Sequence, residues 1–221
     1  MAEQVHIAIG PHKGQPIRHA GESLERARAA MLMVHGRGAV AEEILMLSEQ
    51  LPEPGFAYLA PEAADNTWYP HRFLEPLAVN EPWLSSALSA LDEIVAKIAG
   101  AGIPLERTML LGFSQGACLS LEYAARHARR YGGLVGLSGA LIGPAGTPRA
   151  YAGSLDGTPV FLGCSDADPH VAKEHVQATA SVLRGLGGDV TERLYPNMGH
   201  IVNQDEIDSV RRIMRRLAAG G

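Results

Sequence analysis

Short apolar segments alternate with amphipathic segments along most of the chain. Six apolar runs have the length and composition of buried strands, at residues 29–35, 56–60, 108–112, 133–137, 159–164 and 190–195. Apolar residues spaced three and four apart predict five helices, at residues 40–51, 83–99, 115–127, 171–186 and 204–218. Strands that alternate with helices in this way predict an α/β fold, with a mostly parallel central sheet and helices on both faces.

The remaining segments have no clear periodicity. Residues 1–28 are an N-terminal lead-in, where we expect an edge strand at 5–9. The pattern leaves open whether residues 22–30 are a helical turn or irregular chain. Two further segments, 61–82 and 138–158, are too long for simple turns, and loops of this length in a compact domain are often functional.

The last predicted helix carries signals at both ends. Asn203 and Glu206 have the spacing of a capping box at its start. Four arginines stand in its last turns, where the helix dipole favours cations: Arg211, Arg212, Arg215 and Arg216. This cluster is the one basic patch in the sequence, and the net charge of the chain is −5. A nucleic-acid binder usually has a basic domain with a basic face, so we expect no nucleic-acid partner.

The composition is that of a folded protein, because 46% of the 221 residues are apolar and 19% are charged. We expect a single domain over residues 1–221. Cys118 and Cys164 are too few for a disulfide framework and predict free, buried thiols in a reduced compartment. The first residues lack the features of a signal peptide, and glycine and proline interrupt the longest uncharged run, 131–148, so no membrane span is expected. These features favour a cytoplasmic protein.

The strongest chemical signal is the sequence Gly112-Phe-Ser114-Gln-Gly116, which follows an apolar strand and precedes a helix. At such a strand–turn–helix the serine is held in a strained conformation, and glycines two residues to either side permit the close approach of the chain. The pattern therefore predicts that Ser114 is a nucleophile. The alternative is an ordinary glycine-rich turn between a strand and a helix.

A serine nucleophile needs a base, and the base needs an acid that orients it. In α/β-hydrolases these residues follow the order serine, aspartate or glutamate, then histidine. His200 follows the sixth apolar run and is expected to be the base. Asp166 and Asp168 both follow the fifth run, and the spacing leaves the acid role open between them. Both runs end where the carboxyl ends of parallel strands meet, which is the usual ligand edge of such a sheet.

Ester hydrolysis also needs N–H donors for the oxyanion that develops on the substrate. One is expected from the backbone of Gln115, the residue after the nucleophile. The other is expected from the loop after the first predicted strand, His35-Gly36-Arg37-Gly38, where the N–H of Arg37 is the natural donor. His170 and His175 have no third ligand at a useful spacing, so we expect neither a metal ion nor an organic cofactor.

Together these motifs resemble the α/β-hydrolase superfamily, and within it the phospholipase/carboxylesterase family that includes the acyl-protein thioesterases. The resemblance spans about residues 29–218. It rests on four short motifs, which are His35-Gly36-Arg37-Gly38, Gly112-Phe-Ser114-Gln-Gly116-Ala, Asp168-Pro-His-Val171 and Gly199-His200.

The resemblance also implies roles for individual residues. In that family the carboxylate just before a proline is the triad acid, which implies Asp168 rather than Asp166. It likewise implies oxyanion donors at Arg37 and Gln115, and it makes residues 61–82 an active-site loop. Candidate apolar or aromatic residues for the substrate wall are Trp68, Tyr69, Phe73 and Met198. The alternative for the three aromatic residues is that they pin the long loop to the core.

The chain departs from the acyl-protein thioesterases at two places. Gly38 is followed by Ala39 where they continue Gly-Asp, and Trp68-Tyr69-Pro70 stands where they have Trp-Phe-Asp. We therefore expect a serine carboxylesterase that hydrolyses small or medium acyl esters through an acyl-enzyme, and that acts as a monomer or homodimer. The alternatives are a lysophospholipase or acyl-thioesterase with the same triad, and a non-catalytic binding protein on a hydrolase scaffold.

Overall fold

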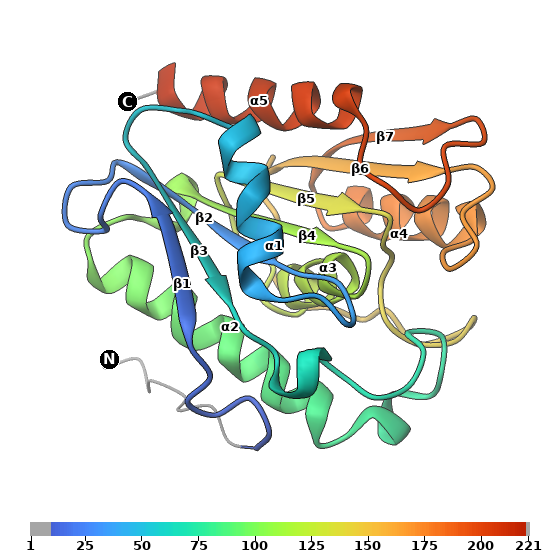
Figure 1. Cartoon of the computed structure of the whole chain (residues 1–221). Coiled ribbons are helices and arrows are strands. Elements are labelled where there is room, and N and C mark those ends of the chain that lie inside the picture. Colours follow the sequence, from blue (N-terminus) through green and yellow to red (C-terminus); the bar gives the residue numbers. More distant parts are fainter. Residues whose placement is uncertain (1–9, 220–221) are drawn as a thin grey trace.

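The computed structural model describes residues 10–219 of the chain. A seven-stranded sheet lies at its centre, with the strand order β1-β3-β2-β4-β5-β6-β7 (Figure 1). The strands are β1 (Ile17–Gly21), β2 (Ala29–Val34), β3 (Phe56–Pro61), β4 (Thr108–Phe113), β5 (Gly133–Leu137), β6 (Pro159–Ser165) and β7 (Asp189–Tyr195). All neighbouring strands are parallel except β1, which is antiparallel to β3. The mostly parallel sheet that the apolar runs predict is confirmed.

Five α-helices connect or flank these strands. They are α1 (Ala41–Leu45), α2 (Trp83–Gly100), α3 (Gln115–Arg126), α4 (Lys173–Gly185) and α5 (Gln204–Ala219). Short 3-10 helices lie at Met46–Gln50, Ala64–Asn66, Leu77–Asn80 and Leu105–Arg107. The predicted helix at 40–51 is therefore one α-helical turn followed by a 3-10 segment, while the other four predicted helices agree with the structure to within two residues.

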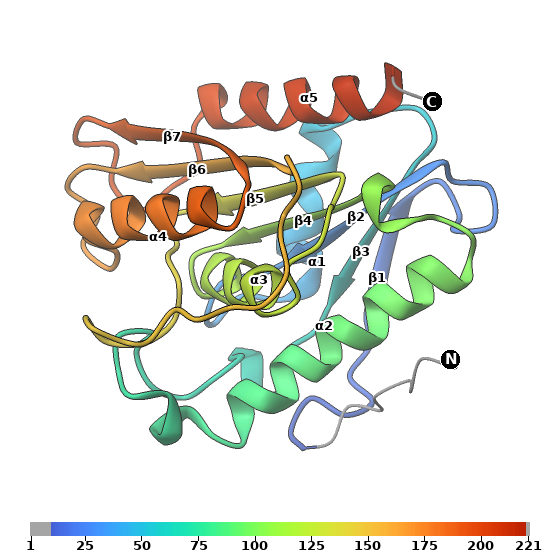
Figure 2. The same cartoon turned by 180° about the vertical axis from the view of Figure 1, so that it is seen from behind.

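The helices cover both faces of the sheet, as Figures 1 and 2 show from opposite sides. On one face, α1 and α5 bury side chains such as Ile44 and Ile213 against Met33 and Met109 of the sheet. On the other face, α2, α3 and α4 form the larger core cluster with the alternate residues of the same strands. The central strands β2 to β6 are buried on both sides, which explains why they read as continuous apolar runs.

The edge strand at the start of the chain differs from the prediction. The expected strand at 5–9 lies outside the described residues, and the structure has its edge strand at Ile17–Gly21. This strand is easily missed in the sequence because none of its five residues is fully buried and three are exposed. Short edge strands that carry a charged residue, here Arg18, are typical of open sheets, since they discourage pairing with other chains. Residues 22–28, left open by the sequence, form turns that lead into β2.

The two long aperiodic segments are mostly irregular in the structure. Residues 61–82 contain two short 3-10 helices, and residues 138–158 contain one isolated bridge, between Gly153 and Ala128. Cys118 and Cys164 are free and buried, as predicted. Among the helices of residues 10–219, none combines the length and apolar character needed to cross a bilayer.

The topology brings the predicted chemical residues to one edge. The strands β2, β4, β6 and β7 are parallel, so the segments that follow their carboxyl ends share one side of the sheet. These segments carry Arg37, Ser114, Asp168 and His200 respectively. The segment after β3, which begins the long loop at 61–82, leaves from the same edge.

Candidate active site

Ser114 occupies a strained turn between β4 and α3. Its backbone has φ 55° and ψ −120°, a region that L-residues rarely adopt and that costs about 1–3 kcal/mol. The flanking glycines make the turn sterically feasible. A Cβ on Gly112 would lie 2.2 Å from the carbonyl oxygen of Gly116, and a Cβ on Gly116 would lie 2.1 Å from that of Val34. The glycine requirement inferred from the sequence motif is therefore met by actual close approaches of the backbone.

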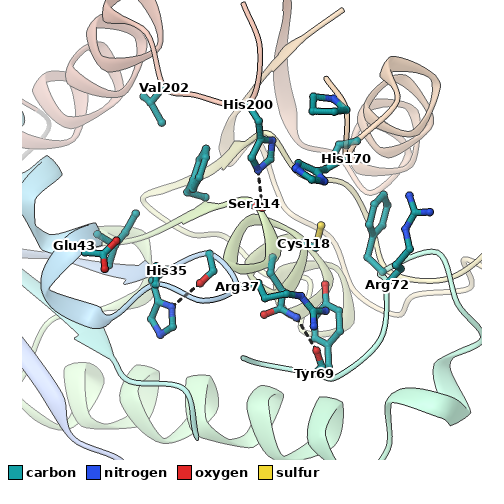
Figure 3. A pocket seen from close by; sticks show the side chains of 18 of the residues that line it. His35, Arg37, Glu43, Tyr69, Arg72, Ser114, Cys118, His170, His200 and Val202 are labelled. Carbon is teal, nitrogen blue, oxygen red and sulfur yellow. Dashed lines mark hydrogen bonds between the residues drawn. The ribbon is translucent and has the colours of Figure 1, made fainter. Parts of the chain in front are cut away.

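Ser114, His200 and Asp168 form a continuous chain of hydrogen bonds. The Oγ of Ser114 lies 2.8 Å from Nε2 of His200, and Nδ1 of His200 lies 2.7 Å from Oδ2 of Asp168 (Figure 3 shows the first contact). Because an ionised carboxylate only accepts hydrogen bonds, the proton of the neutral imidazole belongs on Nδ1. Nε2 is then free to accept the hydroxyl proton of Ser114, which is the arrangement that activates a serine.

The carboxylate of Asp168 is buried and fully hydrogen-bonded. Its Oδ1 accepts the backbone N–H groups of His170, at 2.8 Å, and Val171, at 3.0 Å. Burial alone would raise the pKa of Asp168, but the bonds from His200 and from these two N–H groups outweigh it and leave the pKa below its usual value. Asp168 therefore stays ionised and can stabilise a positive charge on the imidazole of His200.

Asp166 does not contact His200. Its Oδ1 accepts the backbone N–H of Asn197 at 2.9 Å, and Oγ of Ser165 accepts that of Gly199 at 3.2 Å. These two bonds fix the start of the segment that carries His200. Of the two aspartates between which the spacing left the acid role open, Asp168 is the one that contacts His200.

The other end of the His200 segment is fixed by the predicted capping box. The backbone N–H of Asn203 donates to Oε2 of Glu206 at 2.8 Å, and the N–H of Glu206 donates to Oδ1 of Asn203 at 2.9 Å. The capping box is therefore confirmed. Glu206 is fully buried, and burial raises its pKa to about 7.

The two expected oxyanion donors lie beside the nucleophile. Arg37 and Gln115 both line the cavity that contains Ser114. Within residues 10–219, neither backbone N–H group donates a hydrogen bond to another part of the chain. Gly36 brings the turn close to the elbow, because a Cβ placed on it would lie 3.3 Å from Cβ of Ser114. Both N–H groups are therefore without a partner in the described chain, in the two segments that line the cavity beside Ser114.

A cavity of about 890 Å³ opens at this edge of the sheet. Figure 3 shows Ser114 near its centre, with Glu43 and Val202 on one side and Arg72 and His170 on the other. The lining also includes apolar residues from three elements, which are Ile44, Leu47 and Phe113. The volume falls in the range of about 300–1,000 Å³ that is typical of small-molecule sites.

The four predicted wall residues separate into two pairs. Tyr69 and Phe73 line the cavity. Trp68 does not reach it: the side chain is fully buried between the rings of His12 and His35, with centroid distances of 5.3 and 5.0 Å. Trp68 therefore pins the loop to the core, which was the alternative for this group.

Met198 is likewise absent from the cavity lining within the described chain. Its sulfur accepts a hydrogen bond from the side-chain amide of Asn203 at 2.7 Å.

The side chain of Arg37 is exposed and lies along the loop. Its Nη1 donates to the carbonyl oxygen of Pro70 at 2.7 Å, and its Nη2 donates to that of His71 at 2.6 Å. The guanidinium also lies 5.9 Å from the ring centroid of Tyr69. We call residues 66–71 the strap, because they cross the site between the turn after β2 and the elbow.

Gln115 holds the strap from the opposite side. Its Oε1 accepts the backbone N–H of Trp68 at 2.9 Å, and its Nε2 donates to the carbonyl oxygen of Tyr69 at 2.7 Å. A buried amide that both accepts from and donates to a backbone fixes that backbone in one register. The sequence motif predicted a use for the backbone of Gln115 but gave no sign of this use for its side chain.

Two buried histidines support the loop just before the strap. Nε2 of His35 accepts the backbone N–H of Ala63, and Nδ1 of His12 accepts that of Ala64, each at 3.1 Å. Burial lowers the pKa of both histidines, so they remain neutral and keep these acceptor nitrogens free of protons. His12 lies in the lead-in, far from any sequence motif, and its role could be found only from the structure.

His170 and His175, for which the sequence predicts no metal ion, pack against different rings. The ring of His170 lies edge-on to His200, with centroids 4.7 Å apart, and His175 lies edge-on to Phe73 at 5.8 Å. Over residues 10–219, no three side chains of histidine, cysteine, aspartate or glutamate are grouped as a metal site. The lining residues Glu43, Ile44 and Leu47 were not anticipated, although the predicted helix right after the Arg37 turn was a signal that they lie near the site.

Comparison with known proteins gives consistent likenesses. A family model described as phospholipase/carboxylesterase matches residues 20–217. The crystal structure of a phospholipase/carboxylesterase from Dyadobacter fermentans has a TM-score of 0.89 and 39% identity, and the alignment covers 94% of this chain and 99% of that one.

Two relatives match over shorter stretches. An acyl-protein thioesterase 1 from Gibberella zeae is 34% identical over 122 residues, which is 52% of this chain and 50% of that protein. A probable carboxylesterase from Oryza sativa is 29% identical over 129 residues, or 57% of this chain and 48% of that protein. The chain thus spans about half the length of these two relatives.

Proposed function

The chain belongs to the phospholipase/carboxylesterase family of α/β-hydrolases, and on that premise we propose that it is a serine carboxylesterase. Ser114 is the nucleophile, His200 the general base and acid, and Asp168 the carboxylate that orients His200. The single observation that carries the proposal is the hydrogen-bonded chain from Ser114 through His200 to Asp168, at 2.8 and 2.7 Å, on a strained elbow that faces a large cavity.

The first half of the reaction forms an acyl-enzyme. The hydroxyl oxygen of Ser114 attacks the ester carbonyl while Nε2 of His200 takes its proton. The carbonyl oxygen becomes an oxyanion and accepts hydrogen bonds from the backbone N–H groups of Arg37 and Gln115, and one such donor is worth about 3–4 kcal/mol. His200 then gives its proton to the leaving alcohol as the C–O bond breaks.

The second half releases the acid. Water enters the cavity, His200 removes a proton from it, and the resulting hydroxide attacks the acyl carbonyl of the acyl-enzyme. The proton returns to Oγ of Ser114 as the acyl–oxygen bond breaks. Asp168 keeps the proton of neutral His200 on Nδ1 and stabilises the imidazolium in both halves, while the low pKa of its carboxyl means that it accepts no proton itself.

The proposed substrates are small or medium acyl esters. The cavity of about 890 Å³ has apolar residues on the α1 side, including Ile44 and Leu47, that suit an alkyl chain. The second candidate is a lysophospholipase or acyl-thioesterase, favoured by the likeness to acyl-protein thioesterases. Thioesters use the same serine, base and donors, so this candidate differs only in the substrate. A binding protein without catalysis is the third candidate, but it would not require an aligned nucleophile, base and acid.

The test is hydrolysis of p-nitrophenyl esters from acetyl to dodecanoyl by the wild-type protein and by Ser114→Ala. We expect kcat to fall by about 10⁴–10⁶-fold in the variant, as in other triad knockouts, with an unchanged melting temperature. The preferred chain length separates a carboxylesterase, which favours short or medium chains, from a lysophospholipase or long-chain thioesterase. A variant that keeps more than about a tenth of the wild-type activity would refute Ser114 as nucleophile.

A further inference from the structure

The two residues proposed to supply oxyanion donors both use their side chains on the same short segment. Arg37 binds the carbonyl groups of Pro70 and His71, and Gln115 binds the backbone of Trp68 and Tyr69. One residue belongs to the turn after β2 and the other to the nucleophile elbow, about 78 positions apart in sequence. The strap therefore joins the two halves of the proposed oxyanion hole.

The turn after β2 needs an external support because its own backbone is permissive. Gly36 and Gly38 flank Arg37, and Gly38 has φ 77°. Glycines leave the chain free to adopt several conformations, so the direction of the Arg37 N–H is not fixed by the local sequence. The elbow is different, because α3 and β4 hold it from both sides.

Two further hydrogen bonds tie the same turn to the strap. The backbone N–H of Gly38 donates to the carbonyl oxygen of Asn66 at 2.7 Å. The indole N–H of Trp68 donates to the carbonyl oxygen of His35 at 2.9 Å. With the guanidinium of Arg37, the strap thus holds the turn at its beginning, middle and end. Charge-assisted bonds such as those of Arg37 are about twice as strong as neutral ones.

We propose that the side chains of Arg37 and Gln115 are positioning residues, which lock the strap and thereby align the backbone N–H groups of the same two residues on the oxyanion. The inference rests on the proposed function, because it assigns these side chains a part in the same reaction. Alignment matters because a displacement of about 1 Å in a reacting group can cost about 10²-fold in rate. Both terminal nitrogens of the Arg37 guanidinium donate hydrogen bonds to the strap. This engagement favours a positioning role over direct binding of an anionic substrate group.

The test compares Arg37→Met and Gln115→Met, which keep the backbone N–H groups and remove the side-chain hydrogen bonds. Arg26→Met is the matched control, because Arg26 is exposed and its side chain pairs with Glu22, far from the strap in sequence. For Arg37→Met and Gln115→Met we expect kcat to fall by about 10–100-fold with KM within about threefold of wild type, because the oxyanion exists only in the transition state. Arg37→Lys, which keeps one donor, should recover part of the loss.

A second readout isolates the oxyanion hole. An alkyl boronic acid adds to the serine hydroxyl as a tetrahedral anion, so its Ki should rise in Arg37→Met by about the factor that kcat falls. Amide hydrogen exchange of residues 66–71 should become faster in the same variant and remain unchanged in Arg26→Met. This measurement reports on the strap whether or not an ester is turned over.

The outcomes separate the inference from the function on which it rests. If the wild-type protein hydrolyses esters through Ser114 but Arg37→Met keeps its kcat and its boronate Ki, the inference is wrong and the proposed function stands. A rise in KM at constant kcat would also overturn it, since that result means Arg37 binds substrate directly. If the wild-type protein shows no turnover that depends on Ser114, the proposed function fails and the inference fails with it. If Arg37→Met does not fold, Arg37→Lys takes its place. A kcat and a boronate Ki equal to those of the wild type would then overturn the inference.

Discussion

The two long irregular loops, residues 61–82 and 138–158, leave the same edge of the sheet but are anchored in different ways. The first supplies Tyr69, Pro70, Arg72 and Phe73 to the cavity, while the second supplies none of the lining found in the described chain. They meet at one hydrogen bond, from the N–H of Gly143 to the carbonyl oxygen of Phe73 at 2.6 Å. Length and lack of periodicity made both loops candidates for function, and the structure separates them by their contribution to the cavity and by their anchors.

The anchors of the first loop belong to the site or lie beside it. They are the neutral side chains of His12, His35 and Gln115, together with Arg37. The second loop is held by the buried carboxylate of Glu122 on α3, which accepts from the N–H of Ile142 and pairs with Arg126 and Arg149. A change in the first set of anchors should therefore affect catalysis, and a change in the second set should affect stability.

The largest effect on stability is expected from Glu122→Gln. The glutamine has the same size but loses the charge that faces Arg126 and Arg149, and weakening these charged hydrogen bonds together with the one from Ile142 should cost about 2–3 kcal/mol. We expect the free energy of unfolding, measured by urea denaturation, to fall by this amount. The kcat of the folded variant should stay within about twofold of wild type. A large loss of kcat in a stably folded variant would mean that the second loop also shapes the site.

Trp68→Phe should produce a smaller loss of stability and a loss of activity as well. The change removes the indole N–H that binds the carbonyl oxygen of His35, and it leaves a small void in the core. Together these effects should cost about 2 kcal/mol in unfolding free energy, and kcat should fall because the strap loosens. Tyr131→Phe is the control, since it also removes a donor from a buried ring, the hydroxyl that binds the carbonyl oxygen of His127 outside the strap, and should leave kcat unaltered. Equal kcat values in the two variants would mean that loosening the strap does not affect catalysis, which contradicts the role given to the first loop.

The neutral side chains of His12 and His35 predict that the stability of the first loop depends on pH. Burial lowers the pKa of His12 and His35 below 6.5, the value for an exposed histidine. Below pH 6.5 these histidines are protonated in the unfolded chain but stay neutral in the folded chain. The folded state therefore keeps its full stability above pH 6.5 and loses stability as the pH falls from 6.5 toward the lowered pKa values of His12 and His35. Each histidine contributes at most about 1.4 kcal/mol per pH unit.

Hydrogen exchange between pH 7.5 and 5 measures this effect locally. Exchange rates, corrected for intrinsic pH dependence, should rise in residues 61–73 as the pH falls, and those in residues 138–158 should change little. Glu62 lies 3.8 Å from Nε2 of His35 and would partly stabilise a protonated ring, so His12 should dominate the response. Uniform behaviour of the two loops would show that the histidines do not control the first one.

The smallest effect is expected from thiol reagents. Burial raises the pKa of Cys118 to about 11 and that of Cys164 to about 12, so neither forms the reactive thiolate near neutral pH. Iodoacetamide at pH 8 should leave both thiols unmodified in the folded protein and reduce activity by less than about a tenth. Rapid alkylation of Cys118, which lines the cavity, would indicate that the wall beside Tyr69 opens in solution.

The sequence predicted most of the fold because the central strands are buried on both faces and the helices are amphipathic. It also located Ser114, since the two glycines of the elbow are required by contacts that no other residue permits. The edge strand at Ile17–Gly21 was missed because three of its five residues are exposed and none is fully buried. A strand that pairs on one side and faces solvent gives little periodic signal.

Other features of the site depend on the directions of side chains in irregular segments, which the spacing of residues in the sequence does not determine. Asp166 and Asp168 follow the same strand, and only the path of the turn decides which carboxylate meets His200. Trp68 and Tyr69 are neighbours in an irregular segment, where no period predicts that one side chain enters the core and the other faces the cavity. The reach of Arg37 to Pro70 likewise depends on tertiary structure.

The most direct measurement is active-site labelling with a fluorophosphonate, followed by peptide mass spectrometry. The proposed mechanism predicts one equivalent of label on Ser114, none on Ser114→Ala, and labelling slowed by at least about 10³-fold in His200→Ala, where the serine has lost its base. A wild-type protein that stays unlabelled, or that carries the label on another serine, would contradict the assignment of Ser114 as an activated nucleophile.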